Sequence, residues 1–101
     1  MSAYMIVFVD IHDRTRFAQE YVPPILGTLE PYGGRILAAS DEVSTLEGAV
    51  PPGRTVIIEF PDLERAHEWY GSDAYAPLLA LRESIATTSL VAVPGGLTVH
   101  D

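Results

Sequence analysis

Side chains suited to acid–base chemistry and to anion binding stand near the ends of the apolar segments of this chain. Asp10 and His12 close the first of these segments, and Arg54 opens a later one. A carboxylate beside a histidine orients the ring and supports proton transfer near neutral pH. An arginine binds a substrate carboxylate or enolate through two parallel hydrogen bonds. These residues indicate proton transfer on a small anionic compound.

Three further residues, Tyr70, Tyr75 and Arg82, are expected to lie over the same end of the fold. Together with the residues named above they would line one mouth of a pocket and bind the substrate. The alternative is that Asp10 and Arg54 form an ion pair at the sheet edge and that the histidine is an exposed loop residue. This alternative is favoured because most isolated charge pairs are structural.

Glu59 interrupts an apolar segment and lies on the strand face opposite to Ile58 and Phe60. A carboxylate on a covered sheet face needs a partner or has a raised pKa. With a raised pKa, Glu59 would be a general base that removes a proton next to a carbonyl. Paired with Arg35, which is expected at the same end as Tyr4, it would form a structural ion pair, which a dimer could also share. The pair is favoured because buried carboxylates are usually paired.

Trp69 and Tyr70 are adjacent, so they cannot share one helix face. Tyr70 continues the inner stripe of Leu63 and Ala66 and is expected in the core. Trp69 is then expected at the sheet edge or against a partner subunit. Stacking of an aromatic substrate on Trp69 is the alternative.

The composition excludes several kinds of chemistry. The sequence contains neither cysteine nor lysine, which excludes disulfides, thiolate nucleophiles, cysteine-ligated metals and Schiff-base enzymes. The histidines, which are His12, His67 and His100, lack metal-ligand spacing, and no phosphate-binding glycine motif occurs. No metal and no cofactor are therefore expected.

The charge of the chain argues against two classes of partner. A net charge of −8 repels nucleic acid and anionic membrane surfaces. No apolar run approaches the ~18 residues of a membrane span, and the first residues lack the basic region of a signal peptide. With no cysteine, a reducing, cytoplasmic setting is the expectation.

The hydrophobic pattern predicts the elements that position these residues. Phe17, Tyr21, Ile25 and Leu29 recur every fourth residue, which is typical of a buried helical face, and Pro23-Pro24 predicts a kink or restart there. Asp13 and Asp62 are expected as helix caps. The predicted strands are residues 3–11, 35–39, 54–60 and 88–93, and a short last helix is predicted over residues 74–83.

The element order is strand, helix, strand, strand, helix, strand. This order is typical of the α+β, ferredoxin-like βαββαβ fold, in which a four-stranded antiparallel sheet carries both helices on one face. The first and third strands are apolar almost throughout, so their second face should also be covered. The simplest cover is the sheet of a second copy, which predicts a homodimer.

Several motifs follow one another as in a known family: residues 32–35 (YGGR), 46–48 (LEG), 54–61 (RTVIIEFP), 69–72 (WYGS) with Tyr75, and 81–82 (LR). From Tyr4 to about Gly95 the chain therefore resembles the domain of unknown function 1330 family, DUF1330, of the dimeric α/β-barrel superfamily. The resemblance implies one barrel-forming domain over residues 1–96, with a short tail over 97–101. Residues 38–42 depart from the family, because an acidic segment stands where a basic, glycine-containing turn is expected.

The resemblance leaves several functions open, because members of this superfamily include cofactor-free monooxygenases, isomerases and cyclases. The leading hypothesis is a small-molecule-binding homodimer and cofactor-independent isomerase or cyclase, with His12, Asp10 or Glu59 moving the proton. Arg54, Arg35 or Arg82 would hold the anionic oxygen. The alternatives are a non-enzymatic ligand-binding or accessory dimer and a cofactor-free monooxygenase.

Overall fold

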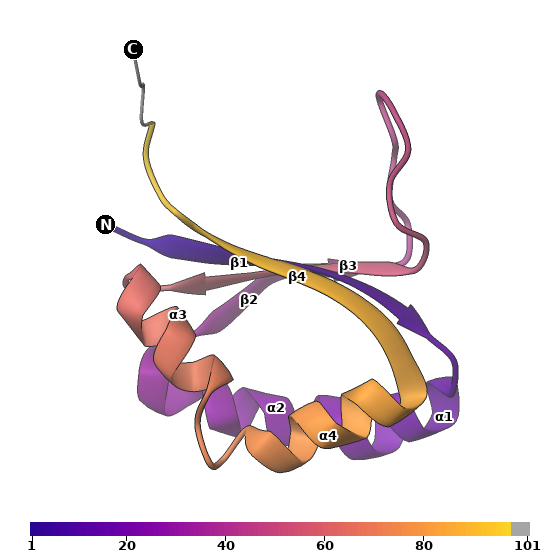
Figure 1. Cartoon of the computed structure of the whole chain (residues 1–101), viewed down its shortest axis with the longest axis horizontal. Helices are drawn as coiled ribbons and strands as arrows, with labels where there is room; N and C mark the ends of the chain where they lie inside the picture. The colour runs from indigo at the N-terminus through magenta and orange to yellow at the C-terminus, as the bar shows by residue number, and fades with distance from the viewer. Residues whose placement is uncertain (98–101) are drawn as a thin grey trace.

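A four-stranded antiparallel sheet carries every helix on one of its faces (Figure 1). The computed structural model describes residues 1–97, so His100 and most of the predicted tail lie outside the described residues. The strands are β1 (Ala3–Ile11), β2 (Arg35–Ser40), β3 (Arg54–Phe60) and β4 (Ala86–Pro94), in the order β2-β3-β1-β4. The α+β, ferredoxin-like arrangement predicted from the element order is confirmed.

Strand β1 has apolar side chains on both faces, which explains its unbroken hydrophobicity. Met5, Val7 and Val9 are buried against the helices, whereas Ile6 and Phe8 alternate with them and lie on the open face. Strand β3 repeats the pattern in register, because its Ile58 pairs with Met5 and its Ile57 with Ile6. The sheet therefore has one face in the core and one apolar face that no helix of residues 1–97 covers.

The first helical segment is built from α1 (Arg14–Arg16), a π-helical turn η1 (Phe17–Tyr21), α2 (Val22–Leu29) and a 3₁₀ turn η2 (Glu30–Tyr32). Asp13 caps it, since its carboxylate accepts a hydrogen bond from the Arg16 N–H at 3.1 Å. The prolines at 23 and 24 fall in the first turn of α2, where the missing N–H groups cost little. The helix therefore restarts there, as predicted.

The buried face of this segment is the predicted one. The four residues spaced by four, Phe17, Tyr21, Ile25 and Leu29, are all buried. The segment ends at Gly33, which adopts a left-handed conformation (φ 71°) that side chains other than glycine rarely take. The chain then turns directly into β2.

Helix α3 (Leu63–Tyr70) begins at the predicted cap, because the Asp62 carboxylate accepts a hydrogen bond from the Arg65 N–H at 2.8 Å. Its buried residues are Ala66 and Trp69, and Tyr70 is 38% exposed. The predicted placement of Trp69 at the edge and Tyr70 in the core is therefore wrong. The indole fills the core and donates a hydrogen bond to the Thr28 hydroxyl at 3.1 Å.

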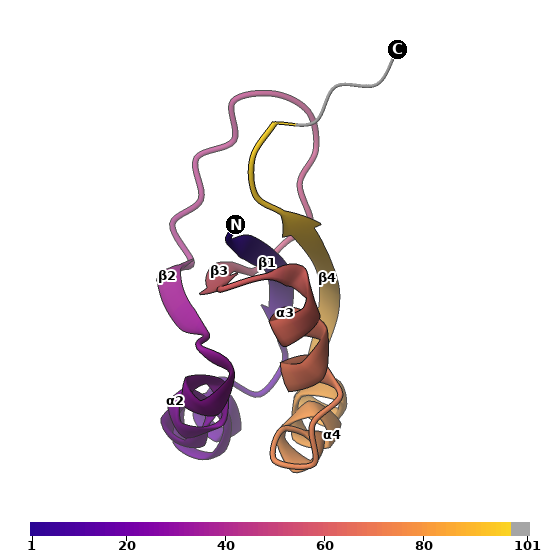
Figure 2. The ribbon, with the colours of Figure 1, turned by 90° about the vertical axis from the view of Figure 1, so that its left-hand side faces the viewer.

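Helix α4 (Ala76–Ile85) follows after a turn over residues 71–75 and leads into β4. Its inner face starts at Tyr75, immediately before the helix, and continues through Leu78, Arg82 and Ile85, all of which are buried. Figure 2 shows α2 and α4 below the sheet, α2 on the side of β2 and α4 on the side of β4, with α3 above α4. A charged arginine thus occupies a position that the helix period assigns to the core.

Residues 41–53 form a loop without regular structure that rises from the open side of the sheet (Figure 1). At its base, Gly53 lies against the backbone of β1, where a Cβ atom would meet the Val9 carbonyl oxygen. Only glycine fits this approach. Within residues 1–97, no helix is long and apolar enough to cross a membrane.

Candidate functional site

A small cavity of about 90 Å³ lies between the helix face of the sheet and the helices. Its walls are aliphatic and aromatic side chains from all four strands together with residues of η1, α2, α3 and α4. Pockets for drug-sized ligands measure ~300–1,000 Å³, so this cavity suits a smaller molecule. Its polar lining residues are Tyr21, Arg54, Trp69, Tyr75 and Arg82.

A pair of tyrosine hydroxyls meets at the helix side of this cavity. The oxygen atoms of Tyr21 and Tyr75 lie 2.6 Å apart in a buried hydrogen bond. Burial raises the pKa of both phenols, although the nearby positive charge of Arg82 opposes this rise. Trp69 packs against Tyr75 with ring centroids 4.1 Å apart. Both tyrosines are therefore rigidly held, neutral hydrogen-bonding groups.

Arg82 has no counter-charge among residues 1–97. The residue is only 5% exposed. Its Nε and Nη1 atoms are fully buried and have no hydrogen-bond partner among residues 1–97. No carboxylate of the described residues lies within salt-bridge distance of it. A buried, unpaired guanidinium is costly, and an anion would satisfy it. The cavity is therefore suited to a small anionic molecule.

Arg54 lies at the rim of the same cavity but already has partners. Its Nη2 donates to the Ala39 carbonyl at 3.2 Å, and its Nη1 lies 3.4 Å from the Asp41 carboxylate. The predicted partner Asp10 points to the other side of the sheet, because Arg54 is in register with Val9 and successive side chains alternate. The expected ion pair between Asp10 and Arg54 is therefore wrong, and Arg54 pairs with Asp41 instead.

The structure does not place Asp10 and His12 in the cavity lining. Asp10 lies on the open face opposite Thr87 of β4, and His12 is an exposed residue whose Nε2 lies 3.0 Å from the Thr87 hydroxyl. The prediction that these two residues line the same pocket mouth as the others is therefore wrong. Tyr75, Arg82 and the rim residue Arg54 are brought together in the lining. Tyr70 packs on Tyr75, with ring centroids 6.2 Å apart, but lines an adjoining groove.

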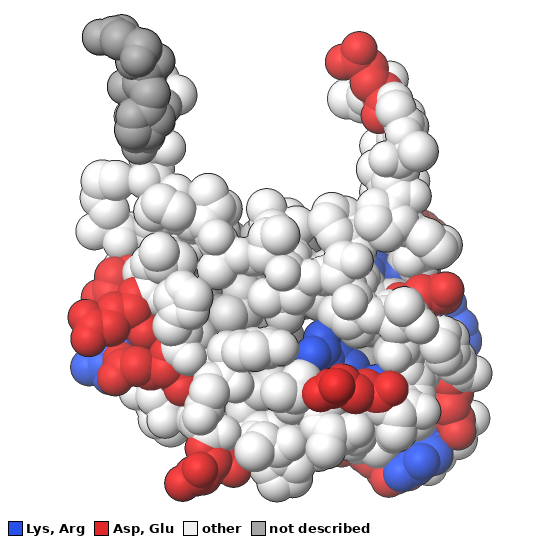
Figure 3. Space-filling view, in the orientation of Figure 1, with Lys and Arg blue, Asp and Glu red and all other residues white. Residues whose placement is uncertain are grey.

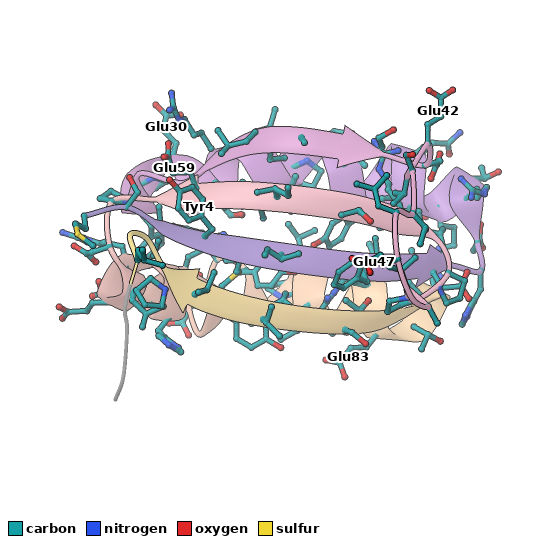
Figure 4. All side chains as sticks on the ribbon, turned by 90° about the horizontal axis from the view of Figure 1, so that it is seen from above. Tyr4, Glu30, Glu42, Glu47, Glu59 and Glu83 are labelled. Carbon is teal, nitrogen blue, oxygen red and sulfur yellow. The ribbon has the colours of Figure 1, made fainter. Side chains whose placement is uncertain are left out.

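The second predicted cluster forms on the open face of the sheet. Glu59 is in register with both Tyr4 and Arg35, and its Oε1 accepts a hydrogen bond from Arg35 Nε at 2.7 Å. Figure 4 shows Tyr4 and Glu59 next to each other on this face. The favoured ion pair is confirmed within one chain. The bond from Arg35 lowers the pKa of Glu59, so the raised pKa required of a general base is not found.

This ion pair gives a first prediction. Because folding lowers the pKa of Glu59, its carboxylate stabilises the fold above the ordinary value of 4.5, and this contribution disappears as the pH falls through the folded-state pKa. We expect Glu59 to titrate below 4.5 in the wild type and closer to 4.5 in the Arg35→Gln variant. Carboxyl ¹³C NMR titration measures both values. Arg65→Gln is the control, and equal pKa values in wild type and Arg35→Gln would contradict the assignment.

The sequence pattern alone does not single out two polar residues of interest. Tyr21 belongs to the apolar stripe, and the one available signal is its hydroxyl, since a hydroxyl inside a buried stripe indicates a polar contact in the core. Thr88, on the helix face of β4, has a buried hydroxyl without a partner among the described residues. Within residues 1–97, no group of three or more His, Asp or Glu side chains is placed to hold a metal ion.

Solved structures share this fold at low sequence identity. A protein of unknown function from Rhodopseudomonas palustris, RPA0582, is 15% identical with a TM-score of 0.75, covering 96% of this chain and 84% of its own. SnoaB, a cofactor-independent oxygenase from Streptomyces nogalater, is 8% identical with a TM-score of 0.66, covering 99% and 98%. An antibiotic biosynthesis monooxygenase is 17% identical with a TM-score of 0.53, covering 96% and 100%.

These identities establish similarity of fold alone, and no curated protein is significantly similar to the chain in sequence. The family model of DUF1330, a domain of unknown function, matches residues 2–96. The resemblance inferred from the ordered motifs is thereby confirmed. Since the match covers nearly the whole length, the chain belongs to the DUF1330 family.

Proposed function

We propose that this protein is a homodimeric, cofactor-independent enzyme that binds a small carbonyl-containing organic acid and transfers a proton on it, as isomerases and cyclases do. The observation that carries the proposal is the buried side chain of Arg82, whose Nε and Nη1 have no hydrogen-bond partner among residues 1–97, in an apolar cavity beside the hydroxyl pair of Tyr21 and Tyr75. A charge that costs folding energy and has no structural partner is typical of a binding site.

Each group has a defined part in this chemistry. Arg82 attracts the anionic substrate and stabilises the negative charge that develops on its oxygen. In the hydroxyl pair of Tyr21 and Tyr75 one phenol donates to the other, so the accepting phenol keeps a proton that it can donate to the developing enolate. The carbon next to the carbonyl gives its proton to a base, and we assign this role to His67, the imidazole that lines the groove on the other side of Arg82.

The earlier acid–base candidates have no contact with substrate in this proposal. Asp10, His12 and Glu59 lie outside the lining of the cavity, and Glu59 is engaged by Arg35. Arg54 lies at the rim, where the Asp41 carboxylate already pairs its charge. Trp69 shapes the cavity wall as a core residue, because it is 1% exposed.

The homodimer is proposed from the uncovered apolar face of the sheet. Ile6, Phe8 and Ile57 of the central strands share this face with Val91 and Val93 of β4, which are 55% and 42% exposed. Figure 3 shows little charge along this side of the sheet, next to the loop of residues 41–53. A second copy packed sheet to sheet would bury these side chains, and the loop of residues 41–53 would flank it.

The experiment is proton exchange at carbon. The protein is incubated in D₂O with a panel of 2-oxo and 3-oxo carboxylic acids, and loss of the α-proton signal is followed by ¹H NMR. We expect accelerated exchange for at least one acid in the wild type, and at least tenfold slower exchange in Arg82→Gln, Tyr75→Phe and His67→Gln. Exchange no faster than without protein for every acid would overturn the proton-transfer proposal and favour a ligand-binding or accessory dimer.

A second candidate function is cofactor-free oxygenation. It is supported by the structural similarity to SnoaB and by the apolar lining of the cavity. Such a reaction needs an electron-rich substrate that reacts with oxygen directly. Oxygen uptake with a panel of hydroquinones and related phenols separates the two functions, because an isomerase consumes no oxygen.

A further inference from the structure

A second, more open cavity lies on the other side of Arg82. This groove, of about 450 Å³, runs between α3, α4 and the edge strand β4. Its walls are partly apolar, and Tyr70 forms an aromatic side of it. It is lined by Met5, His67, Tyr70, Arg82, Thr88, Leu90 and Ala92. We name it the α3–α4 groove.

The unpartnered buried side-chain atoms of the described residues all converge on this groove. They are Nε and Nη1 of Arg82 and the hydroxyl oxygen of Thr88, and both residues line it. Two are N–H donors and the third is a hydroxyl, which can also donate. An acceptor that carries negative charge and more than one oxygen would satisfy them together, as a carboxylate does.

Structural hydroxyls elsewhere in this fold do have partners. The Thr28 hydroxyl donates to the Ile25 carbonyl, that of Ser72 donates to the Trp69 carbonyl, and that of Ser84 donates to the Leu81 carbonyl. The helices therefore satisfy their own hydroxyl groups locally. Thr88 is the exception among the buried hydroxyls of residues 1–97, and it lies where Arg82 is also unsatisfied.

The groove and the inner cavity share two lining residues, Arg82 and Leu90. A molecule bound at Arg82 can therefore have one end in the groove and the other directed toward Tyr21 and Tyr75. The groove is the larger and more accessible of the two spaces, whereas the inner cavity holds only a small group. The bulkier end of such a ligand would therefore lie in the groove, and its smaller end in the inner cavity.

We propose that the α3–α4 groove is the carboxylate subsite and the entrance for the substrate, with Arg82 and Thr88 as the two groups that bind the carboxylate. This inference rests on the proposed function, which supplies the carbonyl group at the other end of the ligand. It specifies the substrate class as a monocarboxylic acid whose acid group stays in the groove while its carbonyl carbon lies toward the tyrosine pair. The positive charge of Arg82 then distinguishes a carboxylate from a neutral amide, and Thr88 adds a hydrogen bond to the bound carboxylate.

The test uses benzoate and the uncharged benzamide as probes, with ¹⁵N-labelled protein observed by NMR. We expect benzoate to shift the amide signals of residues 67, 70, 82 and 88, and benzamide to bind at least tenfold more weakly. Thr88→Val keeps the side-chain shape but lacks the hydroxyl, and we expect it to weaken benzoate binding about tenfold. Thr15→Val, the same change at an exposed site on α1, should leave the affinity unchanged.

Each outcome bears on the proposal. Shifts that cluster in the groove and depend on Thr88 support it. Absence of benzoate binding, shifts confined to other surfaces, or equal affinity in wild type and Thr88→Val would overturn it. The proposed function fails separately: Thr88-dependent benzoate binding without carbon–proton exchange would leave a binding subsite and no proton transfer. If Thr88→Val changes neither carbon–proton exchange nor benzoate binding, the proposed enzymatic function stands and the proposed carboxylate subsite is wrong.

Discussion

Replacing Arg82 with methionine is expected to raise the free energy of unfolding by about 2–4 kcal/mol. The guanidinium is buried without a counter-charge among the described residues, and burying an ion costs several kcal/mol when nothing compensates it. Methionine is flexible enough to fill the same space with apolar atoms. Chemical denaturation at fixed protein concentration measures the change, which corresponds to a rise in melting temperature of about 10 °C or more.

The same substitution is expected to abolish binding of organic acids. This opposite movement of stability and binding separates a functional arginine from a structural one. Arg65→Met is the matched control, because its exposed guanidinium makes only a loose contact with Glu68 at 3.7 Å, and we expect a change within about 0.5 kcal/mol. A large loss of stability in Arg82→Met would show that Arg82 has a structural partner and would contradict the site.

Replacing Ile57 with aspartate is expected to convert the proposed dimer into a monomer. Ile57 lies at the centre of the open sheet face, in register with Ile6, and a second copy would bury it. A carboxylate there would face apolar side chains of the partner without a counter-charge, which costs several kcal/mol at each of the symmetric positions. Size-exclusion chromatography with light scattering measures the mass at several protein concentrations.

Leu26→Asp is the matched control for this substitution. Leu26 is 59% exposed on α2, which lies on the helix side of the sheet and away from the open face. We expect it to leave the mass unchanged. A wild-type protein that is monomeric at all concentrations, or an Ile57→Asp variant that remains dimeric, would contradict the sheet-to-sheet interface.

The strands and the first helical face could be predicted because each depends on one strong local pattern. Residues 3–11 and 54–60 are strands with the predicted bounds, and the stripe from Phe17 to Leu29 is buried. Helix α3 shows where pattern alone is insufficient. Trp69 and Tyr70 lie three and four residues after Ala66, and both spacings fit a helix period. The larger apolar indole, which also reaches the Thr28 hydroxyl, takes the core position.

The candidate site was predicted less completely because its parts depend on which sheet face each side chain takes. Asp10 and Arg54 were correctly placed near one end of the sheet, but alternation along β1 and β3 sends them to opposite faces. The pair of Glu59 and Arg35 is predicted from the common sheet end of the two residues, and in the structure they also lie in register on one face. The isolation of Arg82 and Thr88 could not be predicted, since a missing partner is a property of the packed structure rather than of spacing.

Native mass spectrometry tests the central claim, an Arg82-anchored site for a small organic acid, most directly. Wild type and Arg82→Met are purified in parallel from the same host without carboxylate buffers, and both are then exposed to benzoate. We expect a dimer of the wild type that carries a small acid, and an Arg82→Met dimer without it. A wild type that holds no acid under either condition, or an acid retained equally by both proteins, would contradict the account.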